Sequence, residues 1–214
     1  MLRQIISNPE PLNIIVVVFS YLIIFIISFP IHESAHALMA KWLGDTTAAE
    51  QGRISLNPLR HLDPMGTILM LIGGFGWAKP VPVQPYKARK VSMRAAMALT
   101  AAAGPISNVL IALVFMIIGK IFIITVPFGI ETTLWLITAV QLIISINLGL
   151  AVFNLIPIPP LDGSRIATYF LPQRIYFKIM QYENIIFIAL LVALWFGILD
   201  GPISFVSNAV TGIL

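Results

Sequence analysis

The stretch LNIIVVVFSYLIIFIISFPIHESAHALMA, residues 12–40, decides how this chain folds. Its residues 12–31 are almost all apolar and about as long as the roughly 20-residue helix that crosses a bilayer. The stretch then carries three ionisable side chains, His32, Glu33 and His36. Each ionisable group at membrane depth costs about 2.5–3.5 kcal/mol on insertion scales, and such groups usually have a function. The sequence therefore predicts a membrane helix that ends in a functional polar cluster.

The composition of the whole chain indicates a membrane protein. Of its 214 residues, 58% are hydrophobic and 10% are charged, whereas soluble domains average about 25% charged residues. The net charge of +4 comes without a basic run interleaved with aromatics, so nucleic acid is not an expected partner. Because cysteine is absent, any metal must be held by His, Asp or Glu. We expect a polytopic α-helical membrane protein that forms one membrane-embedded domain over residues 1–214.

Four membrane spans are expected, at about 12–43, 94–119, 134–156 and 184–199. The first is expected to kink at Pro30 and to be retained, because no small-residue cleavage site precedes it. Residues 45–92 form a polar loop whose apolar piece, 66–76, is too short to span and is expected to be re-entrant or interfacial. A short extended β segment is expected after it. Residues 201–214 have no predicted placement.

The lysines and arginines are distributed unevenly across this topology. Of the 13 in the chain, all but Arg3 and Lys120 fall on one face of the membrane. Basic loops remain in the cytoplasm, so the N-terminus is expected outside and the polar cluster toward the cytoplasmic side.

The spacing of the polar cluster predicts a metal site. His32 and His36 are four residues apart and share one helix face, while Glu33 lies about 100° around the helix. This HExxH pattern fits zinc hydrolysis, in which two neutral imidazoles hold Zn²⁺ and the glutamate serves as general base. The same string also occurs in soluble helices whose histidines are merely exposed, but the membrane setting favours the metal.

A third ligand must come from elsewhere in the chain. Asp162 lies in NLIPIPPLDGSRI, residues 154–166, where three prolines prevent a regular helix. Such backbone at membrane depth must be buried in protein or line a watery cavity, so Asp162 is the favoured candidate. The alternative is an ordinary turn with a local Asx bond. His61 is a competing ligand, although a solvated loop histidine between Arg60 and Asp63 is the simpler interpretation.

Three motifs, HESAH (32–36), AGPISN (103–108) and NLIPIPPLDG (154–163), together resemble the site-two protease family. Members of this family are zinc metalloproteases that cut substrate helices within the membrane. The resemblance implies one zinc ion held by His32, His36 and Asp162, with Glu33 as the catalytic base. It covers residues 12–166, and the chain resembles a minimal form without an inserted PDZ domain. It also implies an integral protein of a prokaryotic cell membrane whose substrates are single-span membrane proteins.

Two asparagines are further candidates. The resemblance implies that Asn154 binds substrate or stabilises the oxyanion, and the alternative is a hydrogen bond to a neighbouring helix. The motif that ends in Asn108 resembles a family packing motif near the active site, which close helix approach explains without chemistry. Asn108 is therefore only a candidate substrate-binding residue.

The extended piece GWAKPVPVQPY, residues 76–86, is a candidate substrate-binding edge. Pro80 and Pro82 lie two residues apart, so their missing donors face the same side. The other edge keeps the donors of Lys79, Val81 and Val83. We expect this edge to pair with an unwound substrate by strand addition, and an ordinary extended connector is the alternative.

The sequence thus favours an intramembrane zinc endopeptidase. The alternative is a zinc-binding membrane protein without protease activity, either an inactive relative or a metal carrier.

Overall fold

The computed structural model describes residues 11–73, 77–126 and 129–197 of the chain, and no strand forms among them. The helices of this part are α2 (Pro11–Ile23), the π-helix η1 (Ile24–Ser28), α3 (Phe29–Leu43), α4 (Thr47–Glu50), η2 (Pro58–Arg60), α5 (Pro64–Gly73), η3 (Pro85–Lys87), α6 (Met93–Thr125), α7 (Ile130–Leu155), α8 (Asp162–Ala167), α9 (Gln173–Met180) and α10 (Glu183–Trp195).

Among the described residues, three helical segments are long and apolar enough to cross a membrane. They are Ile14–Leu43 with 30 residues, Met93–Thr125 with 33 and Ile130–Leu155 with 26. Large apolar side chains such as Val18 and Ile117 are exposed on their surfaces, where lipid would solvate them. The first three predicted spans are therefore confirmed as apolar helices of spanning length.

The fourth predicted span, 184–199, corresponds only in part to a helix of the structure. Helix α10 has 13 residues and is about 20 Å long at 1.5 Å per residue, which is shorter than the roughly 30 Å hydrocarbon core. Residues 198–199, like the tail 201–214, lie outside the described residues. In the described part of the chain, α10 is thus an apolar helix of less than spanning length.

In its described residues, the loop between the first two long helices forms short helices and no β segment. Helix α5 has ten residues, and its first turn is capped by Asp63 Oδ1, which accepts a hydrogen bond of 2.9 Å from the Gly66 N–H. The prediction of a strand over 76–86 is wrong for its described residues, which form only an isolated antiparallel bridge between Leu62 and Ala78. Prolines at 80, 82 and 85 lack the N–H donors that would continue a ladder.

The predicted irregularity at Pro30 takes the form of a π-helical turn. The five residues Ile24–Ser28 precede the proline, and the Phe29 N–H donates to Ile24 O across a wider turn. Because Pro30 has no N–H, the regular α-helical pattern cannot pass through it, and a π turn absorbs the mismatch. The two halves of the first long helix are joined in this way.

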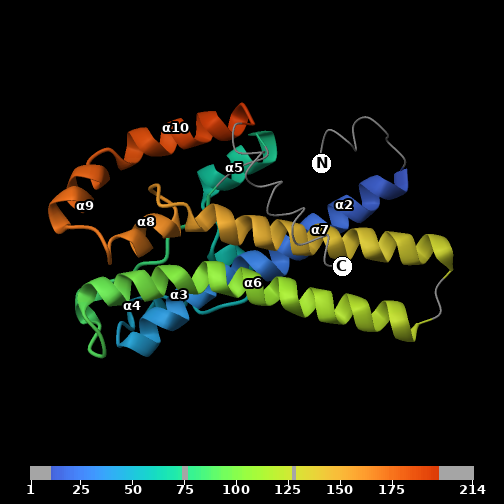
Figure 1. The fold of residues 1–214 in the computed structure, drawn as a ribbon, viewed down its shortest axis with the longest axis horizontal. Coiled ribbons are helices and arrows are strands. Elements are labelled where there is room, and N and C mark those ends of the chain that lie inside the picture. The colour runs from blue at the N-terminus through green and yellow to red at the C-terminus, as the bar shows by residue number, and fades with distance from the viewer. Residues whose placement is uncertain (1–10, 74–76, 127–128, 198–214) are drawn as a thin grey trace.

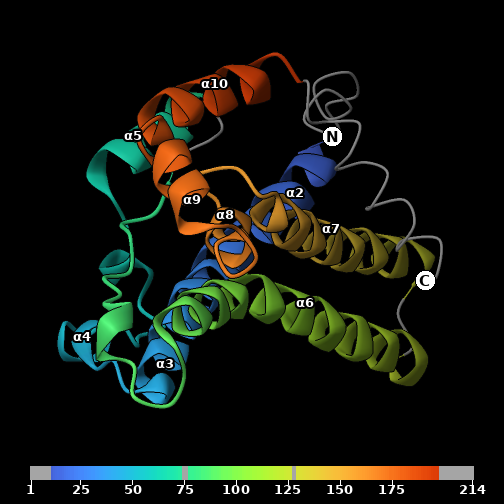
Figure 2. The ribbon, with the colours of Figure 1, turned by 60° about the vertical axis from the view of Figure 1, so that its left-hand side comes forward.

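The long helices bring distant segments to one end of the molecule (Figure 1). Helices α6 and α7 run antiparallel, and the last turn of α6 and the first turn of α7 lie at the opposite end from α4 and α8. Gly119 allows the close approach of α6 and α7, because a Cβ there would lie 2.7 Å from Val140 Cγ1. Both ribbon views place α5 and α10 together on the side of α7 that faces away from α6 (Figure 2).

Candidate metal centre

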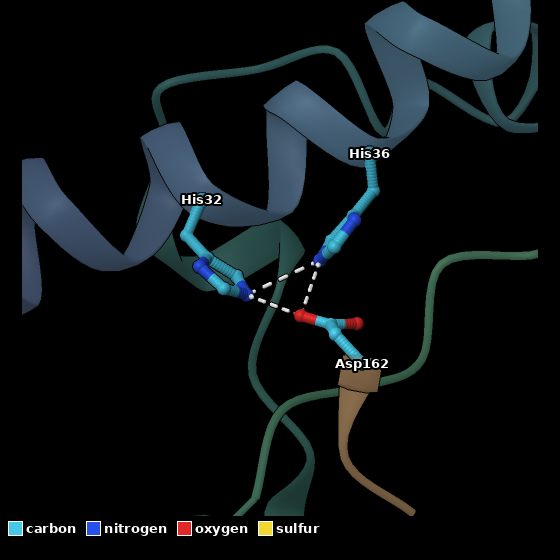
Figure 3. A group of neighbouring side chains, drawn as sticks. All are labelled: His32, His36 and Asp162. Atoms are coloured by element: carbon cyan, nitrogen blue, oxygen red, sulfur yellow. Dashed lines mark hydrogen bonds and ion pairs between the residues drawn. The ribbon is translucent and has the colours of Figure 1, made fainter. Parts of the chain in front are cut away.

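His32, His36 and Asp162 converge at the point where α3 meets α8 (Figure 3). The two histidines project from one face of α3, and their Nε2 atoms are 3.1 Å apart. Asp162 is the first residue of α8, and its Oδ2 lies 3.4 Å from each of these nitrogens. The three side chains are 12, 10 and 15% exposed, respectively. The α-helical spacing of the histidines and the turn before α8 thus produce one compact ligand group.

The separations of these three atoms fit a zinc ion. Tetrahedral zinc with bonds of about 2.0–2.1 Å separates its ligand atoms by about 3.3–3.4 Å. The observed 3.1, 3.4 and 3.4 Å are close to the edges of such a tetrahedron. A fourth corner is left for water or substrate, as in catalytic zinc sites.

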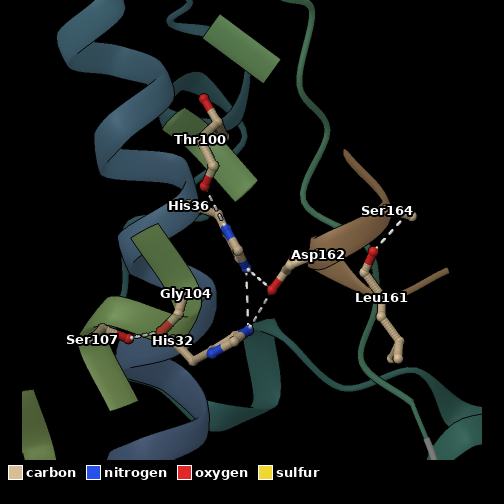
Figure 4. A network of polar contacts seen from close by, with 8 residues as sticks. All are labelled: His32, His36, Thr100, Gly104, Ser107, Leu161, Asp162 and Ser164. Carbon is tan, nitrogen blue, oxygen red and sulfur yellow. Dashed lines mark hydrogen bonds and ion pairs between the residues drawn. The ribbon is translucent and has the colours of Figure 1, made fainter. Parts of the chain in front are cut away.

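The hydrogen atoms of the site also favour a cation between the three groups. His36 Nδ1 lies 2.8 Å from Thr100 O (Figure 4), and a carbonyl only accepts, so Nδ1 carries the hydrogen of the neutral ring. Its Nε2 then presents a lone pair toward Asp162 Oδ2, a buried oxygen without a hydrogen-bond donor among the described residues. A metal ion satisfies both atoms, and the Thr100 carbonyl fixes the ligand orientation.

Contacts with the histidines also affect the acidity of Asp162. Burial raises the pKa of its carboxyl group, but when His32 and His36 are protonated, their hydrogen bonds and charges outweigh burial and lower that pKa well below its usual range. The carboxyl group is therefore ionised at neutral pH, as a zinc ligand must be.

Gly104 of α6 lies directly against both imidazoles. A Cβ on this residue would come within 2.5 Å of His36 Cε1 and 2.6 Å of His32 Cε1. The carbonyl of Gly104 accepts a hydrogen bond of 2.7 Å from Ser107 Oγ. The close helix approach predicted for the AGPISN motif is confirmed, and here it brings α6 against the ligand group.

A cleft of about 690 Å³ opens at the ligand group, and all the candidate site residues predicted from the sequence line it except the competing ligand His61. These residues are His32, Glu33, Val81, Val83, Asn108, Asn154, His36 and Asp162. Within the described part of the chain, no hydrogen bond engages the Glu33 carboxylate, although the residue is only 9% exposed. The cleft therefore unites segments from α3, the loop, α6, α7 and α8.

The polar lining of the cleft includes two asparagine side chains, one of them buried and the other half-buried. Asn108 is 1% exposed, and its Oδ1 has no hydrogen-bond partner among the described residues. Asn154 is half-buried near the end of α7. Amides from two different helices thus border the same space as the ligand group.

His61 does not belong to the ligand group. It is fully buried, its Nε2 lies 2.8 Å from Ser55 O, and its ring meets Phe29 edge to face at 6.3 Å. Both sequence interpretations of this residue, a competing ligand and a solvated loop histidine, are therefore wrong. Its role is to hold the loop against α3.

Sequence reasoning did not anticipate several residues of the cleft. The segment from α8 to α10 contributes to its lining Arg165, Met180, Glu183, Asn184 and Phe187. Phe187 packs edge to face on Trp77, with ring centroids 5.3 Å apart. These residues carry no motif and no ligand spacing, so only the fold reveals that α10 borders the cleft.

A His₂Asp ligand group with a glutamate beside it, inside an apolar helical protein, defines the class of membrane metallohydrolases. The chain belongs to peptidase family M50, the zinc metalloproteases of the site-two type. A family model described as Peptidase family M50 matches residues 119–195, a range that includes Asn154 and Asp162 but not the histidine pair.

Two named relatives support this membership. The protein named "Putative zinc metalloprotease YwhC" of Bacillus subtilis (strain 168) is 44% identical over 178 residues, which cover 80% of this chain and 78% of that protein. The protein named "Putative zinc metalloprotease Rip2" of Mycobacterium tuberculosis is 29% identical over 144 residues, which cover 65% of this chain and 52% of Rip2 in each of two strains. No solved structure matches the chain.

Proposed function

We propose that this protein is an intramembrane zinc endopeptidase that cleaves the transmembrane segments of single-span membrane proteins. The observation that carries the proposal is the triangle of His32, His36 and Asp162 inside a cleft that also contains Glu33. The three residues hold one zinc ion. A bound zinc ion supplies a Lewis acid that lowers the pKa of water toward about 7.

The protein's own residues perform the proton transfers of this reaction. The Glu33 carboxylate accepts a proton from the attacking water and returns it to the amine that leaves the cleaved peptide bond. Asn154 donates an amide N–H to the carbonyl oxygen of that peptide bond as negative charge develops on it. The Thr100 carbonyl keeps His36 in the tautomer that a ligand requires.

The substrate enters as an extended strand along residues 81–83. Val81 and Val83 line the cleft, and among the described residues no hydrogen bond uses their backbone N–H groups. A helix that unwinds beside them gains partners for its own carbonyls by strand addition. Strand addition to this edge predicts that Val81→Pro or Val83→Pro slows cleavage while the bound zinc is retained, because proline removes the N–H donor.

The cleft faces the cytoplasmic side of a prokaryotic cell membrane. Helix α4 of the loop and helices α8 and α9 of the segment after α7 lie at the same end of the long helices, and these two segments hold most of the basic residues. By the positive-inside rule this end is cytoplasmic. In this arrangement helix α10 is embedded in the membrane beside the cleft.

Cleavage of a panel of single-span substrates by purified protein tests the proposal. Wild type is compared with Glu33→Gln, which removes the proton acceptor without changing a ligand. Glu50→Gln is the matched control, because Glu50 is exposed and its carboxylate accepts a hydrogen bond only from Thr46 Oγ1 in the described part of the chain.

The proposal requires that Glu33→Gln binds zinc as wild type does and cleaves at least a hundredfold more slowly, with Glu50→Gln unaffected. If neither wild type nor Glu33→Gln cleaves any substrate although zinc is bound, the protein is a zinc-binding membrane protein without protease activity.

A further inference from the structure

Two buried charged side chains, Asp45 and Arg53, reach the loop that borders the cleft. They are 1% and 4% exposed, respectively. In the described part of the chain neither forms an ion pair, and both bind the backbone instead. A buried charge is stable only when it is well hydrogen-bonded, so these contacts identify what each residue holds in place.

Arg53 holds the first end of segment 79–84. Its Nη1 donates to Arg60 O at 2.8 Å, and its Nη2 donates to the carbonyls of Lys79 and Pro80. One side chain thus reaches three carbonyls, which requires the several donors of a guanidinium and cannot be reproduced by an amide.

The same arginine is linked to the metal-binding helix. Ser34, which lies between His32 and His36, donates from Oγ to Ser55 O at 2.8 Å and accepts from the Ser55 N–H at 3.1 Å. The loop that carries Arg53 is therefore tied to α3 at the level of the ligands.

Asp45 holds the other end of the segment. Its Oδ2 accepts a hydrogen bond of 2.5 Å from the Gln84 N–H, while Oδ1 accepts one of 3.0 Å from the Thr47 N–H. Asp45 follows directly after Gly44, whose left-handed φ of 111° ends α3. Both ends of segment 79–84 are thus fixed to parts of the chain that adjoin the metal-binding helix.

The middle of the segment stays unpaired between these two anchors. Val81 and Val83 face the cleft, with backbone N–H groups that engage no described partner. An edge that is already ordered but still unpaired loses little conformational entropy when a second strand adds to it.

We propose that Asp45 and Arg53 are positioning residues that hold the edge at 81–83 beside the metal centre, so that a strand of substrate added to this edge is aligned with the zinc ligands. The inference rests on the proposed function and deepens it. Neither residue touches the reacting atoms.

Spectroscopy on the full chain tests the order of the edge without substrate. The chain has no cysteine, so Pro82→Cys gives a single site for a nitroxide spin label. Arg53→Gln and Asp45→Ala are expected to raise the mobility of this label. Arg60→Gln is the matched control, because it also removes an arginine charge from the loop, here an exposed one, but leaves the carbonyl that Arg53 binds.

Kinetics on the unlabelled variants provide the second readout. Loss of an ordered edge weakens binding in the ground state and the transition state alike, so KM is expected to rise at least fivefold while kcat stays within about twofold. Zinc is expected to stay at one ion per chain. Asp45→Asn, which keeps an oxygen acceptor for the Gln84 N–H, is expected to recover most of the loss.

The outcomes separate the two proposals. Unchanged label mobility and unchanged KM in Arg53→Gln and Asp45→Ala, with zinc bound, would overturn the positioning role. Where these variants fail to fold, Arg53→Lys, which keeps the charge but loses the guanidinium fork, decides by the same two readouts. Failure of wild type to cleave any substrate refutes the proposed function, and the label mobility then still decides whether Asp45 and Arg53 order the edge.

Discussion

Substitution of Gly104 by alanine is the most specific prediction that the metal centre allows. The added Cβ would come within 2.5 Å of His36 Cε1 and 2.6 Å of His32 Cε1. Carbon atoms pack at about 3.5–4.0 Å, so the imidazoles or α6 must move by about 1 Å. His36 has little freedom to turn away, because its Nδ1 is bound to Thr100 O on the same helix as Gly104.

A displacement of this size exceeds what a zinc site tolerates. Ligand distances in zinc sites hold to about 0.2 Å, and loss of ligand orientation alone costs about 10–100-fold in metal affinity. We therefore expect Gly104→Ala to bind zinc at least about a hundredfold more weakly than wild type and to lose cleavage at limiting zinc.

Zinc titration against a competing chelator measures this affinity, and Gly119→Ala supplies the matched control. Gly119 lies on the same helix, and a Cβ there would lie 2.7 Å from Val140 Cγ1, far along α6 from the ligands. Gly119→Ala is expected to lower stability without changing zinc affinity. Equal zinc affinity in Gly104→Ala and wild type would refute the reasoning.

Three further predictions follow from the site and the loop. Asn154→Ala is expected to lower kcat by about 10²–10³-fold with zinc retained, measured on the same substrates, because an amide donor to the developing oxyanion is lost. Metal removal by chelation is expected to lower the melting temperature, because zinc at a thousand times its Kd contributes about 4 kcal/mol to the folded state. Burial raises the pKa of Asp45, but hydrogen bonds from Thr47 and Gln84 and the charge of Lys87 more than offset it, so the folded-state pKa is lowered. The free energy of unfolding that Asp45 contributes is thus complete above the unfolded pKa near 4, and it declines as acid protonates the folded carboxylate. Denaturant unfolding below about pH 5 is therefore expected to show a steeper loss of stability with falling pH in wild type than in Asp45→Asn. Parallel curves of stability against pH for the two proteins would contradict this.

The long helices and the ligand group could be predicted because their signals are local. An unbroken apolar run specifies a spanning helix, and four-residue spacing places His32 and His36 on one face. The position of Asp162 after three prolines marked an irregular segment beside the membrane helices. These features need no knowledge of how the helices pack.

The remaining features depend on contacts between distant segments. The described residues 77–86 have the composition of a strand, but their prolines remove the donors along one side, so they join no sheet, and buried side chains hold them in place instead. His61 has charged neighbours in sequence, yet its burial against Phe29 follows only from the folded loop. Glu183 reaches the cleft because α10 packs there, which no local pattern encodes.

The most direct test of the account is the zinc content of Asp162→Ala, measured with wild type and with Asp63→Ala as the control. Asp63 caps α5 through the Gly66 N–H and lies outside the ligand group. The account predicts one zinc ion per chain in wild type and Asp63→Ala, and loss of zinc and cleavage together in Asp162→Ala. Full zinc content and cleavage in Asp162→Ala would contradict it.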